Sequence, residues 1–231
     1  MIKAVLTDIE GTTTDIDFVH KVLFPYAYQK LPQFVREQQE NEAIKDVLQQ
    51  TRELIGDNNA DIETLIQVLL DWIEQDKKLT PLKALQGLIW DAGYKNGDFR
   101  GHVYDDAYQA LQTWHAKGIR LFVFSSGSVK AQKLLFSCSD FGDITPLFSS
   151  YFDTTTGAKR EAQSYRSIAE STGFAPAEIA FLSDVQEELD AAREAGMATI
   201  LLARNQSLSS SSHKTVRDFA EIDIGHINER S

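Results

Sequence analysis

The chain has 231 residues, of which 42% are hydrophobic and 25% are charged, and its formal net charge at pH 7 is −11. This composition suits a globular protein with a substantial core, whereas the acidic excess argues against nucleic acid or an anionic membrane as a partner. No stretch approaches the ~20 consecutive apolar residues that span a bilayer. Because a single cysteine, Cys138, excludes an internal disulfide, we expect a reducing, cytoplasmic location.

Five apolar segments rich in β-forming residues predict strands, and helical patterns separate the last four of them. The predicted strands cover residues 3–7, 119–125, 150–153, 179–183 and 199–203. The helices between the last four cover residues 129–136, 160–172 and 187–195. Near-continuous apolar strands that alternate with helices are typical of a parallel sheet with both faces covered, so we predict an α/β fold with a doubly wound sheet.

The segment between the first two predicted strands differs, because it shows only helical patterns. The predicted helices cover residues 24–40, 42–55, 62–75, 81–92 and 105–116. In the third of these helices, Leu65, Leu69 and Trp72 fall on one apolar stripe, as in packed helical bundles. We therefore expect an α/β core formed by residues 1–16 and 101–231, with a helical domain of residues 17–100 inserted after the first strand.

Acidic residues follow two of the predicted strands, at the sheet edge where ligands of open parallel sheets bind. The first strand runs into Asp8 and Glu10, and the fourth strand runs into Asp184. Clustered acids repel one another, and their burial costs free energy unless a cation or a proton compensates. Converging carboxylate oxygens suit Mg²⁺, which also accepts phosphate oxygens. We therefore predict that Asp8, Glu10 and Asp184 form a Mg²⁺ site.

Other polar groups at the same edge have both a functional and an ordinary structural explanation. Ser125 and Ser126 lie in "SSGS", which offers hydroxyls and backbone N–H groups to a phosphate but also suits an ordinary turn before a helix. Glu188 lies four residues after Asp184 and could orient a metal-bound water, but Asp184 and Glu188 could instead cap the helix that follows Asp184. Lys159 could neutralise a phosphate and a nucleophilic carboxylate, although a single lysine is usually a solvated surface charge.

A carboxylate beside Mg²⁺ and a bound phosphate is a candidate nucleophile that forms an aspartyl-phosphate, which suits Asp8. A second acid, Glu10, could protonate the leaving oxygen and later activate water. In chain order, these groups form four motifs. The first strand ends in Asp-x-acid-Gly-Thr, the second ends in Ser, a Lys follows, and an acid then follows another apolar strand. This order resembles the haloacid dehalogenase superfamily, which implies a Mg²⁺-dependent phosphatase with an aspartate nucleophile, a doubly wound core and an inserted cap.

The chain departs from the superfamily pattern at Glu10, where the second acid is usually aspartate. The stretches "DIEGTTTDIDFVHKVLFPYA", "LKALQGLIWDAGYKNG", "VFSSGSVKAQKLLF", "FDTTTGAKREAQSYRSIA" and "FLSDVQEELDAA" together resemble the narrower enolase-phosphatase, or acireductone synthase, family. This resemblance covers nearly the whole chain. It implies that a diketo-methylthiopentyl phosphate of methionine salvage is enolised to an enol phosphate and then dephosphorylated to acireductone.

The same resemblance implies roles for particular residues. Asp8 and Asp184 would bind Mg²⁺ through their side chains, Glu10 would bind it through its backbone carbonyl, and Asp8 would be the nucleophile. Three residues would bind the substrate phosphate: Ser125, Ser126 and Lys159. The base that removes a proton in the enolisation stays open between Glu10 and Lys159.

Three rival interpretations remain at this point. The nearest is another capped phosphatase, acting on a sugar phosphate or phosphoglycolate. A dehalogenase would leave Glu10 and the phosphate-binding groups unexplained. A non-enzymatic aspartyl-phosphate switch is about half this length and carries its acid pair and its phosphorylated aspartate on different strands. We expect a monomer that acts on a small phosphorylated diketone and binds neither nucleic acid nor membrane.

Overall fold

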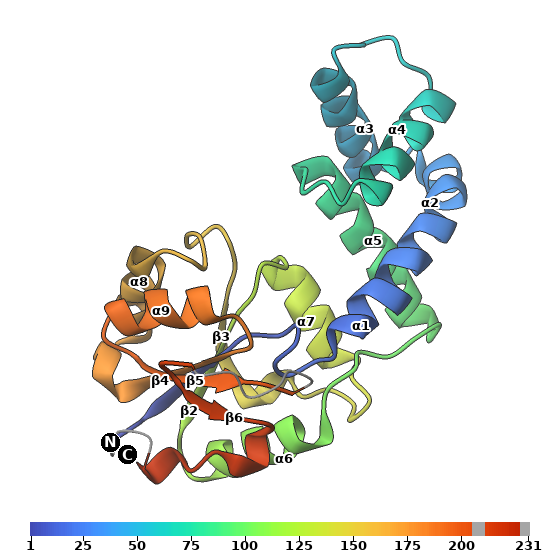
Figure 1. Ribbon diagram of the computed structural model, residues 1–231. Helices are drawn as coiled ribbons and strands as arrows, with labels where there is room; N and C mark the ends of the chain where they lie inside the picture. Colours follow the sequence, from blue (N-terminus) through green and yellow to red (C-terminus); the bar gives the residue numbers. More distant parts are fainter. Residues whose placement is uncertain (205–210, 227–231) are drawn as a thin grey trace. The chain divides into compact units, whose positions relative to one another are not determined.

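The computed structural model describes residues 1–204 and 211–226, and its centre is a six-stranded parallel sheet in the core unit (Figure 1). The strand order is β3-β2-β1-β4-β5-β6, so the first strand lies between β2 and β4. The strands are β1 (Ala4–Thr7), β2 (Arg120–Phe124), β3 (Phe148–Phe152), β4 (Ile179–Ser183), β5 (Ala198–Leu202) and β6 (Lys214–Val216). The predicted α/β class with a doubly wound parallel sheet is confirmed.

Helices cover both faces of this sheet, which is why its central strands are apolar throughout. Helices α8 (Ala162–Thr172) and α9 (Gln186–Glu194) pack on one face, where the Tyr165 ring centroid lies 5.5 Å from that of Phe124 and 5.0 Å from that of Phe181. Figure 1 shows α6 (Asp105–Ala116) on the opposite face. The right-handed rule for parallel crossovers places α7 (Val129–Ser137) on the same face as α6.

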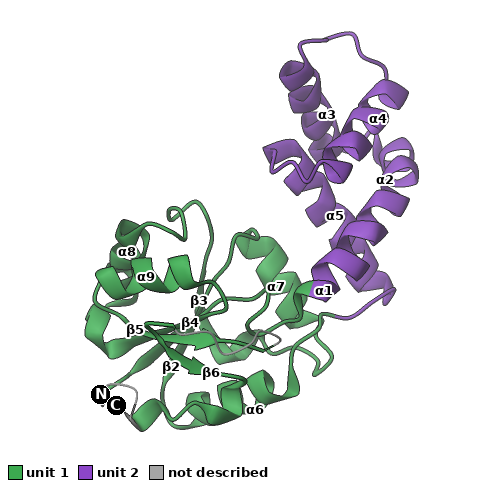
Figure 2. Cartoon of the chain, viewed as in Figure 1, with its two compact units in different colours: residues 1–16, 101–231 green, residues 17–100 purple. Residues whose placement is uncertain are grey.

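The chain divides into two compact units (Figure 2). Residues Met1–Ile16 and Gly101–Ser231 form the first, which we call the core unit, and Asp17–Arg100 form the second, which we call the insert unit. The helical segments up to the end of the insert unit are α1 (Ile16–Phe18), a π-helical turn (Val19–Leu23), α2 (Phe24–Gln38), α3 (Glu42–Ile55), α4 (Ile62–Glu74) and α5 (Thr80–Asn96). Short 3₁₀ turns in the core unit cover Thr145–Leu147, Pro176–Glu178, Phe219–Glu221 and Ile224–His226.

The helices of the insert unit begin and end at residues that suit those positions. The Asn41 side chain accepts a hydrogen bond from the Ala43 N–H at the start of α3, and Asp61 accepts one from the Thr64 N–H at the start of α4. Four helices then bury one shared set of apolar side chains, which includes Leu31, Leu65 and Leu69. Their burial in one cluster stabilises helices that would be marginal alone.

Some element boundaries differ from the predicted ones, and one strand was not predicted. Helix α5 ends at Asn96 rather than at residue 92, and it passes through Gly93, where a Cβ would lie 2.6 Å from the Phe99 ring, so only glycine lets that ring pack against the helix. Strand β3 begins two residues before the predicted position and contains an irregular step in its pairing with β2. Strand β6 was not predicted, because three residues at a sheet edge carry too little periodicity.

We expect two leucines of α3 to differ sharply in their contribution to stability. The Leu48 side chain is buried in the insert core, whereas the Leu54 residue is 55% exposed on the same helix. Leu48→Ala should lower the free energy of unfolding by about 2–5 kcal/mol, because it removes buried methyl groups and leaves a cavity. Leu54→Ala should change it by less than about 0.5 kcal/mol. Urea denaturation of both variants tests this, and equal losses would contradict the packing described here.

Candidate active site

Three neighbouring strands end at one edge of the sheet and bring polar side chains together there. Asp8 follows β1, Ser125 follows β2 and Asp184 follows β4. The pairing register places Thr7, the last residue of β1, beside Val123 of β2 and Leu182 of β4. These polar groups come from sequence positions far apart, yet they are neighbours because their strands are parallel and adjacent.

The threonines after Asp8 form a tight, buried turn that holds the strand end in place. The Ile9 carbonyl oxygen accepts hydrogen bonds from the backbone N–H groups of Thr12, Thr13 and Thr14, at 3.1, 2.9 and 2.9 Å. All three threonines are fully buried. From outside the turn, the Arg204 Nε–H donates to the Thr12 carbonyl oxygen at 2.8 Å. The backbone that carries Asp8 and Glu10 is therefore fixed by its own hydrogen bonds and by one from another part of the core unit.

A buried lysine lies between two carboxylates at the centre of the site. The Lys159 Nζ lies 2.7 Å from Asp8 Oδ1 and 2.7 Å from Glu188 Oε2. Burial opposes the charged form of Lys159, but the two carboxylates outweigh that effect and raise its pKa. The Ser183 hydroxyl lies 3.4 Å from Asp8 Oδ2 and 3.0 Å from Glu188 Oε2, and so spans the same two acids. Lys159 therefore remains an ammonium that orients Asp8.

The remaining acids at this edge lack such compensation. Asp184 Oδ1 is buried and has no hydrogen-bond partner in the described part of the chain. Burial, and next the charge of Asp8, raise the pKa of Asp184 to about 6. Burial and the same Asp8 charge raise the pKa of Glu10, whose carboxylate accepts a hydrogen bond from the Ser125 hydroxyl at 3.1 Å. A carboxylate oxygen without a partner in an acidic cluster is the place where a cation would bind.

The donor set at this edge fits Mg²⁺. No group of three His, Cys, Asp or Glu side chains within residues 1–204 and 211–226 is arranged to hold a metal by itself. Two carboxylate side chains, Asp8 and Asp184, together with the Glu10 backbone carbonyl would supply three hard oxygen ligands. Mg²⁺ typically keeps several waters and needs only one or two carboxylates, so a small ligand set suits it.

The close approach of Asp184 to the turn that follows β1 depends on a glycine in that turn. Gly11 has φ of 76°, in the left-handed region, and a Cβ built on it would overlap the Asp184 carboxylate. Asp184 can therefore approach the turn after β1 only because this residue has no side chain.

Comparisons with known proteins show the family to which this chain belongs. A family model for haloacid dehalogenase-like hydrolases matches residues 2–196. Enolase-phosphatase E1 of Pseudomonas syringae pv. syringae (strain B728a) is 55% identical over 222 residues, covering 96% of this chain and 97% of that protein. The chain belongs to the enolase-phosphatase family of haloacid dehalogenase-like hydrolases. Enolase-phosphatase E1 of Citrobacter koseri is also 55% identical, over 223 residues, with 96% and 97% coverage.

A solved structure shares both the fold and the chain length of this family member. The UTR4 protein of Saccharomyces cerevisiae is 34% identical and superposes with a TM-score of 0.83. The match covers 96% of this chain and 100% of the yeast chain. The resemblance stated from the sequence is thereby confirmed at the level of the family, whereas the role of each site residue remains a prediction.

For "SSGS" and for Asp184 the sequence left both a structural and a functional explanation open, and the structure bears on each. Ser128 is the N-cap of α7, with its hydroxyl accepting from the Ala131 N–H at 3.3 Å, so "SSGS" is partly a helix start. Ser125 is buried against Glu10, whereas the Ser126 residue is exposed. No side chain among the described residues caps α9, whose N-cap residue is Val185, and the Val185 N–H donates to the Ser183 hydroxyl at 3.1 Å. Asp184 is therefore left for another partner.

Two features of this enolase-phosphatase site were not predicted. One is Ser183, whose hydroxyl contacts both Asp8 and Glu188. The other is the ion pair between Lys159 and Glu188, since the sequence suggested only a helix cap or a role near the metal for Glu188. A polar residue ending the apolar strand "IAFLS" was the available signal for Ser183.

Gly11→Ala should be more damaging to activity than a matched glycine substitution. Gly173 has the same φ of 76°, but a Cβ there meets no atom within 4 Å. Both substitutions to alanine should destabilise the protein by about 1–2 kcal/mol, since both force a left-handed backbone on a residue with a Cβ. Gly11→Ala should also slow phosphate release at least about tenfold, because it displaces Asp184. Thermal unfolding and phosphatase assays of the pair measure both effects, and equal activities would contradict the close approach.

Proposed function

We propose that this protein is a Mg²⁺-dependent enolase-phosphatase, an acireductone synthase. It converts diketo-methylthiopentyl phosphate through an enol phosphate to acireductone and inorganic phosphate. The observation that supports this most directly is the Asp8 carboxylate held by Lys159 and Ser183 beside the unpartnered oxygen of Asp184. The two bacterial enolase-phosphatases that match nearly the whole chain support the substrate class.

Asp8 is the nucleophile of the phosphatase step. Its carboxylate oxygen attacks phosphorus, the bond from phosphorus to the enol oxygen breaks, and an aspartyl-phosphate forms. Lys159, which already contacts Asp8 Oδ1, neutralises charge on the nucleophile and the phosphoryl oxygens. Ser125 and Ser126, at the end of β2, bind the phosphate.

Glu10 is the general acid and base of the same step. Burial and the neighbouring Asp8 raise the pKa of Glu10, so once its carboxylate has taken up a proton it holds that proton and can give it to the leaving enol oxygen. In the second half of the step the Glu10 carboxylate takes a proton from water. That water attacks the aspartyl-phosphate, releases inorganic phosphate and regenerates Asp8.

The enolisation needs a base, and the ion pairs at the site favour Glu10 over Lys159 for this role. The Lys159 ammonium is held by two carboxylates at 2.7 Å each, so it has no free electron pair with which to accept a proton. The Glu10 carboxylate accepts only the hydrogen bond from Ser125 among the side-chain contacts described for it. Glu10 is therefore the proton acceptor that we propose for the first step.

Mg²⁺, when bound by Asp8, Asp184 and the Glu10 carbonyl, would supply charge neutralisation at the phosphate and polarisation of a substrate carbonyl. The chain's own residues then orient the nucleophile and move the protons. We propose that the insert unit serves as the cap of the enzyme and that the protein acts as a cytoplasmic monomer. No helix among the described residues is long and apolar enough to cross a membrane.

Removal of divalent metal should abolish turnover. Asp184 Oδ1 has no other partner in the described structure, and the acids around it repel one another, so the site without a cation is poorly organised. After EDTA treatment and gel filtration, phosphate release should fall at least about 100-fold, and added Mg²⁺ should restore it. Mass spectrometry of the treated protein verifies the metal content. Full activity in a verified metal-free sample would contradict the proposed cofactor.

Asp8→Asn tests the two-step reaction itself. The amide keeps the shape of the side chain but loses the nucleophilic carboxylate, so phosphate release should fall roughly a thousandfold or more. Proton abstraction does not require that nucleophile, so the enol phosphate should accumulate and appear as a new ultraviolet absorbance. Asp184→Ala should lose both steps, because it removes a ligand that serves both.

The same experiment distinguishes the proposed function from its nearest rival. A phosphatase for another phosphomonoester would hydrolyse sugar phosphates or phosphoglycolate efficiently and would form no enol signal from the diketone phosphate. If the wild-type protein gives that pattern, the phosphatase chemistry stands but the enolase-phosphatase assignment is wrong.

A further inference from the structure

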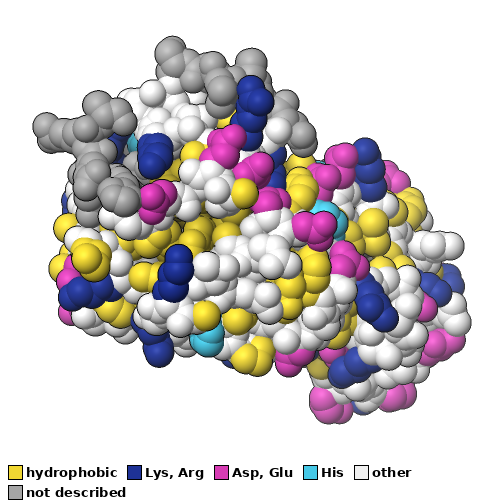
Figure 3. Space-filling model, turned by 90° about the horizontal axis from the view of Figure 1, so that it is seen from below, with side chains coloured by type: hydrophobic (Ala, Val, Ile, Leu, Met, Phe, Trp, Pro, Cys, Tyr) yellow, Lys and Arg dark blue, Asp and Glu magenta, His cyan; other side chains and the backbone are white. Residues whose placement is uncertain are grey.

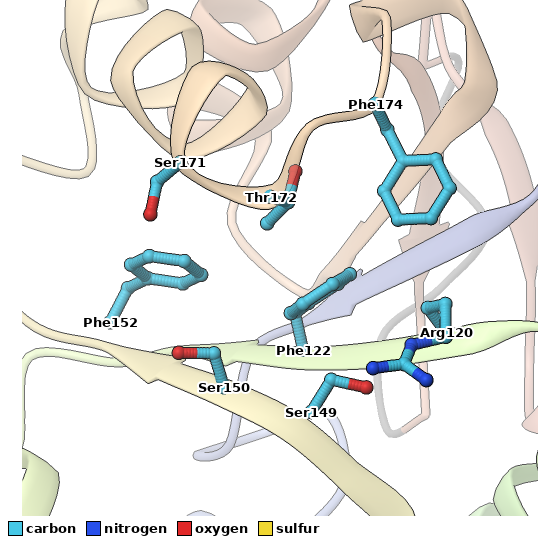
Figure 4. Close-up of a pocket in the computed structure, with 8 residues that line it drawn as sticks. All are labelled: Arg120, Phe122, Ser149, Ser150, Phe152, Ser171, Thr172 and Phe174. Atoms are coloured by element: carbon cyan, nitrogen blue, oxygen red, sulfur yellow. The ribbon is translucent and has the colours of Figure 1, made fainter.

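A recess of about 440 Å³ lies in the core unit, away from the groups assigned to the active site (Figure 4). It is lined by residues of β2 and β3 and by the end of α8 with the loop that follows. Arg120, at one side of the recess, is the first residue of β2, whereas the active-site residue Ser125 follows the last residue of that strand. A recess of this size can hold a small organic molecule.

A β-bulge in the edge strand β3 shapes one wall of the recess. Leu121 of β2 pairs with Phe148, but the next residue, Phe122, pairs with Ser150. Ser149 is therefore an extra residue. In a regular strand, neighbouring side chains point to opposite faces, but both Ser149 and Ser150 line this recess. The bulge thus places two successive serines along the same recess, with the Ser149 hydroxyl on the Arg120 side and the Ser150 hydroxyl on the Phe152 side (Figure 4).

Most polar groups of the recess have no protein partner among the described residues, whereas the Thr172 hydroxyl donates to the Ala169 carbonyl oxygen at 3.0 Å. The exposed Arg120 guanidinium has no ion pair or hydrogen bond within residues 1–204 and 211–226. In the same part of the chain, the hydroxyls of Ser149, Ser150 and Ser171 have no side-chain hydrogen bond either. Figure 4 shows the Ser149 hydroxyl pointing toward the Arg120 guanidinium. A positive charge with neighbouring hydroxyls, free of acidic partners, is a set of groups that binds an oxyanion.

Aromatic side chains supply the apolar part of the recess. The Phe122 ring centroid lies 6.2 Å from that of Phe174 and 6.4 Å from that of Phe152, with the rings inclined to one another. Phe122 and Phe152 are anchored in the sheet and almost fully buried, so the aromatic floor is rigid. Phe174 is only partly buried, so among these three rings it offers the surface on which another aromatic group can pack.

We propose that this recess binds a small organic oxyanion that carries a flat apolar group. The carboxylate or phosphate oxygens of such a ligand bind Arg120 and the Ser149 hydroxyl, and its ring packs on Phe174, which is only partly buried. The site is separate from the phosphatase chemistry, because none of its lining residues contributes to that reaction. The chain as a whole has a net charge of −11 and repels anions. The attraction for the oxyanion therefore comes from Arg120 itself rather than from the whole surface.

Titration of the full-length protein with three phenyl compounds tests the proposal. Phenylacetate presents a carboxylate, phenylphosphonate presents a phosphorus oxyanion that a phosphatase cannot hydrolyse, and phenylacetamide is neutral. At least one anion should shift the backbone amide signals of Arg120, Ser149 and Thr172 in ¹H–¹⁵N spectra with a saturable curve. Phenylacetamide should bind at least about tenfold more weakly, because it lacks the charge that Arg120 recognises. Comparison of the two anions shows which oxyanion the recess accepts.

Two arginine variants separate the recess from general charge effects. Arg120→Gln keeps a polar, hydrogen-bonding side chain but removes the charge, so it should weaken binding of the preferred anion at least about tenfold. Arg166→Gln is the matched control on the exposed side of α8, where Arg166 is paired with Glu194 outside the recess, and it should change binding by less than about twofold. Both variants should keep wild-type thermal unfolding and phosphatase rates. The proposal is overturned if neither anion saturates, if shifts occur only at the active-site edge, or if Arg120→Gln binds as the wild type does.

Discussion

The ion pair between Lys159 and Asp8 is the interaction on which the chemistry of the core unit depends. A buried ammonium is costly unless it is paired, and a buried carboxylate is costly for the same reason. Each of these groups therefore makes the other tolerable, and Glu188 and Ser183 complete the arrangement at 2.7 and 3.0 Å. The parallel pairing of β1 with β4 makes this possible, because it places Asp8 beside the strand that ends in Ser183.

The single positive charge of Lys159 does not balance the negative charges of the carboxylates at this edge. The imbalance raises the pKa values of some of these acids. Burial and Asp8 raise the pKa of Asp184 to about 6, and burial and Asp8 raise that of Glu188 to about 7 despite its contact with Lys159. On the face that Figure 3 displays, acidic and basic side chains are interspersed. The strain of like charges is thus concentrated at the strand ends, where a divalent cation or a bound substrate can relieve it.

The sequence predicted the sheet and the helices well, because buried strands and amphipathic helices leave strong periodic signals. Asp8, Glu10, Ser125 and Asp184 were found because each follows such a strand. Contacts that depend on three-dimensional packing were not predictable in the same way. The bulge at Ser149 and the bridging of two acids by Ser183 arise from the register between strands, which no local pattern in the sequence reports.

A large insertion separates β1 from α6 in the sequence. The core unit must therefore hold the two chain segments on either side of the insertion together without help from the inserted residues. The core unit achieves this by joining the two segments that border the insertion. The Thr14 hydroxyl donates to the His102 carbonyl oxygen at 2.8 Å, the Asp15 N–H donates to His102 Nδ1 at 3.0 Å, and the Tyr104 N–H donates to the Thr13 carbonyl oxygen at 2.9 Å. These bonds bring the ends of the insertion together within the core, so the insertion behaves as a closed loop whose entropic cost grows only slowly with length. The residues that fix the turn after Asp8 therefore also hold together the two chain segments between which an entire helical unit is inserted.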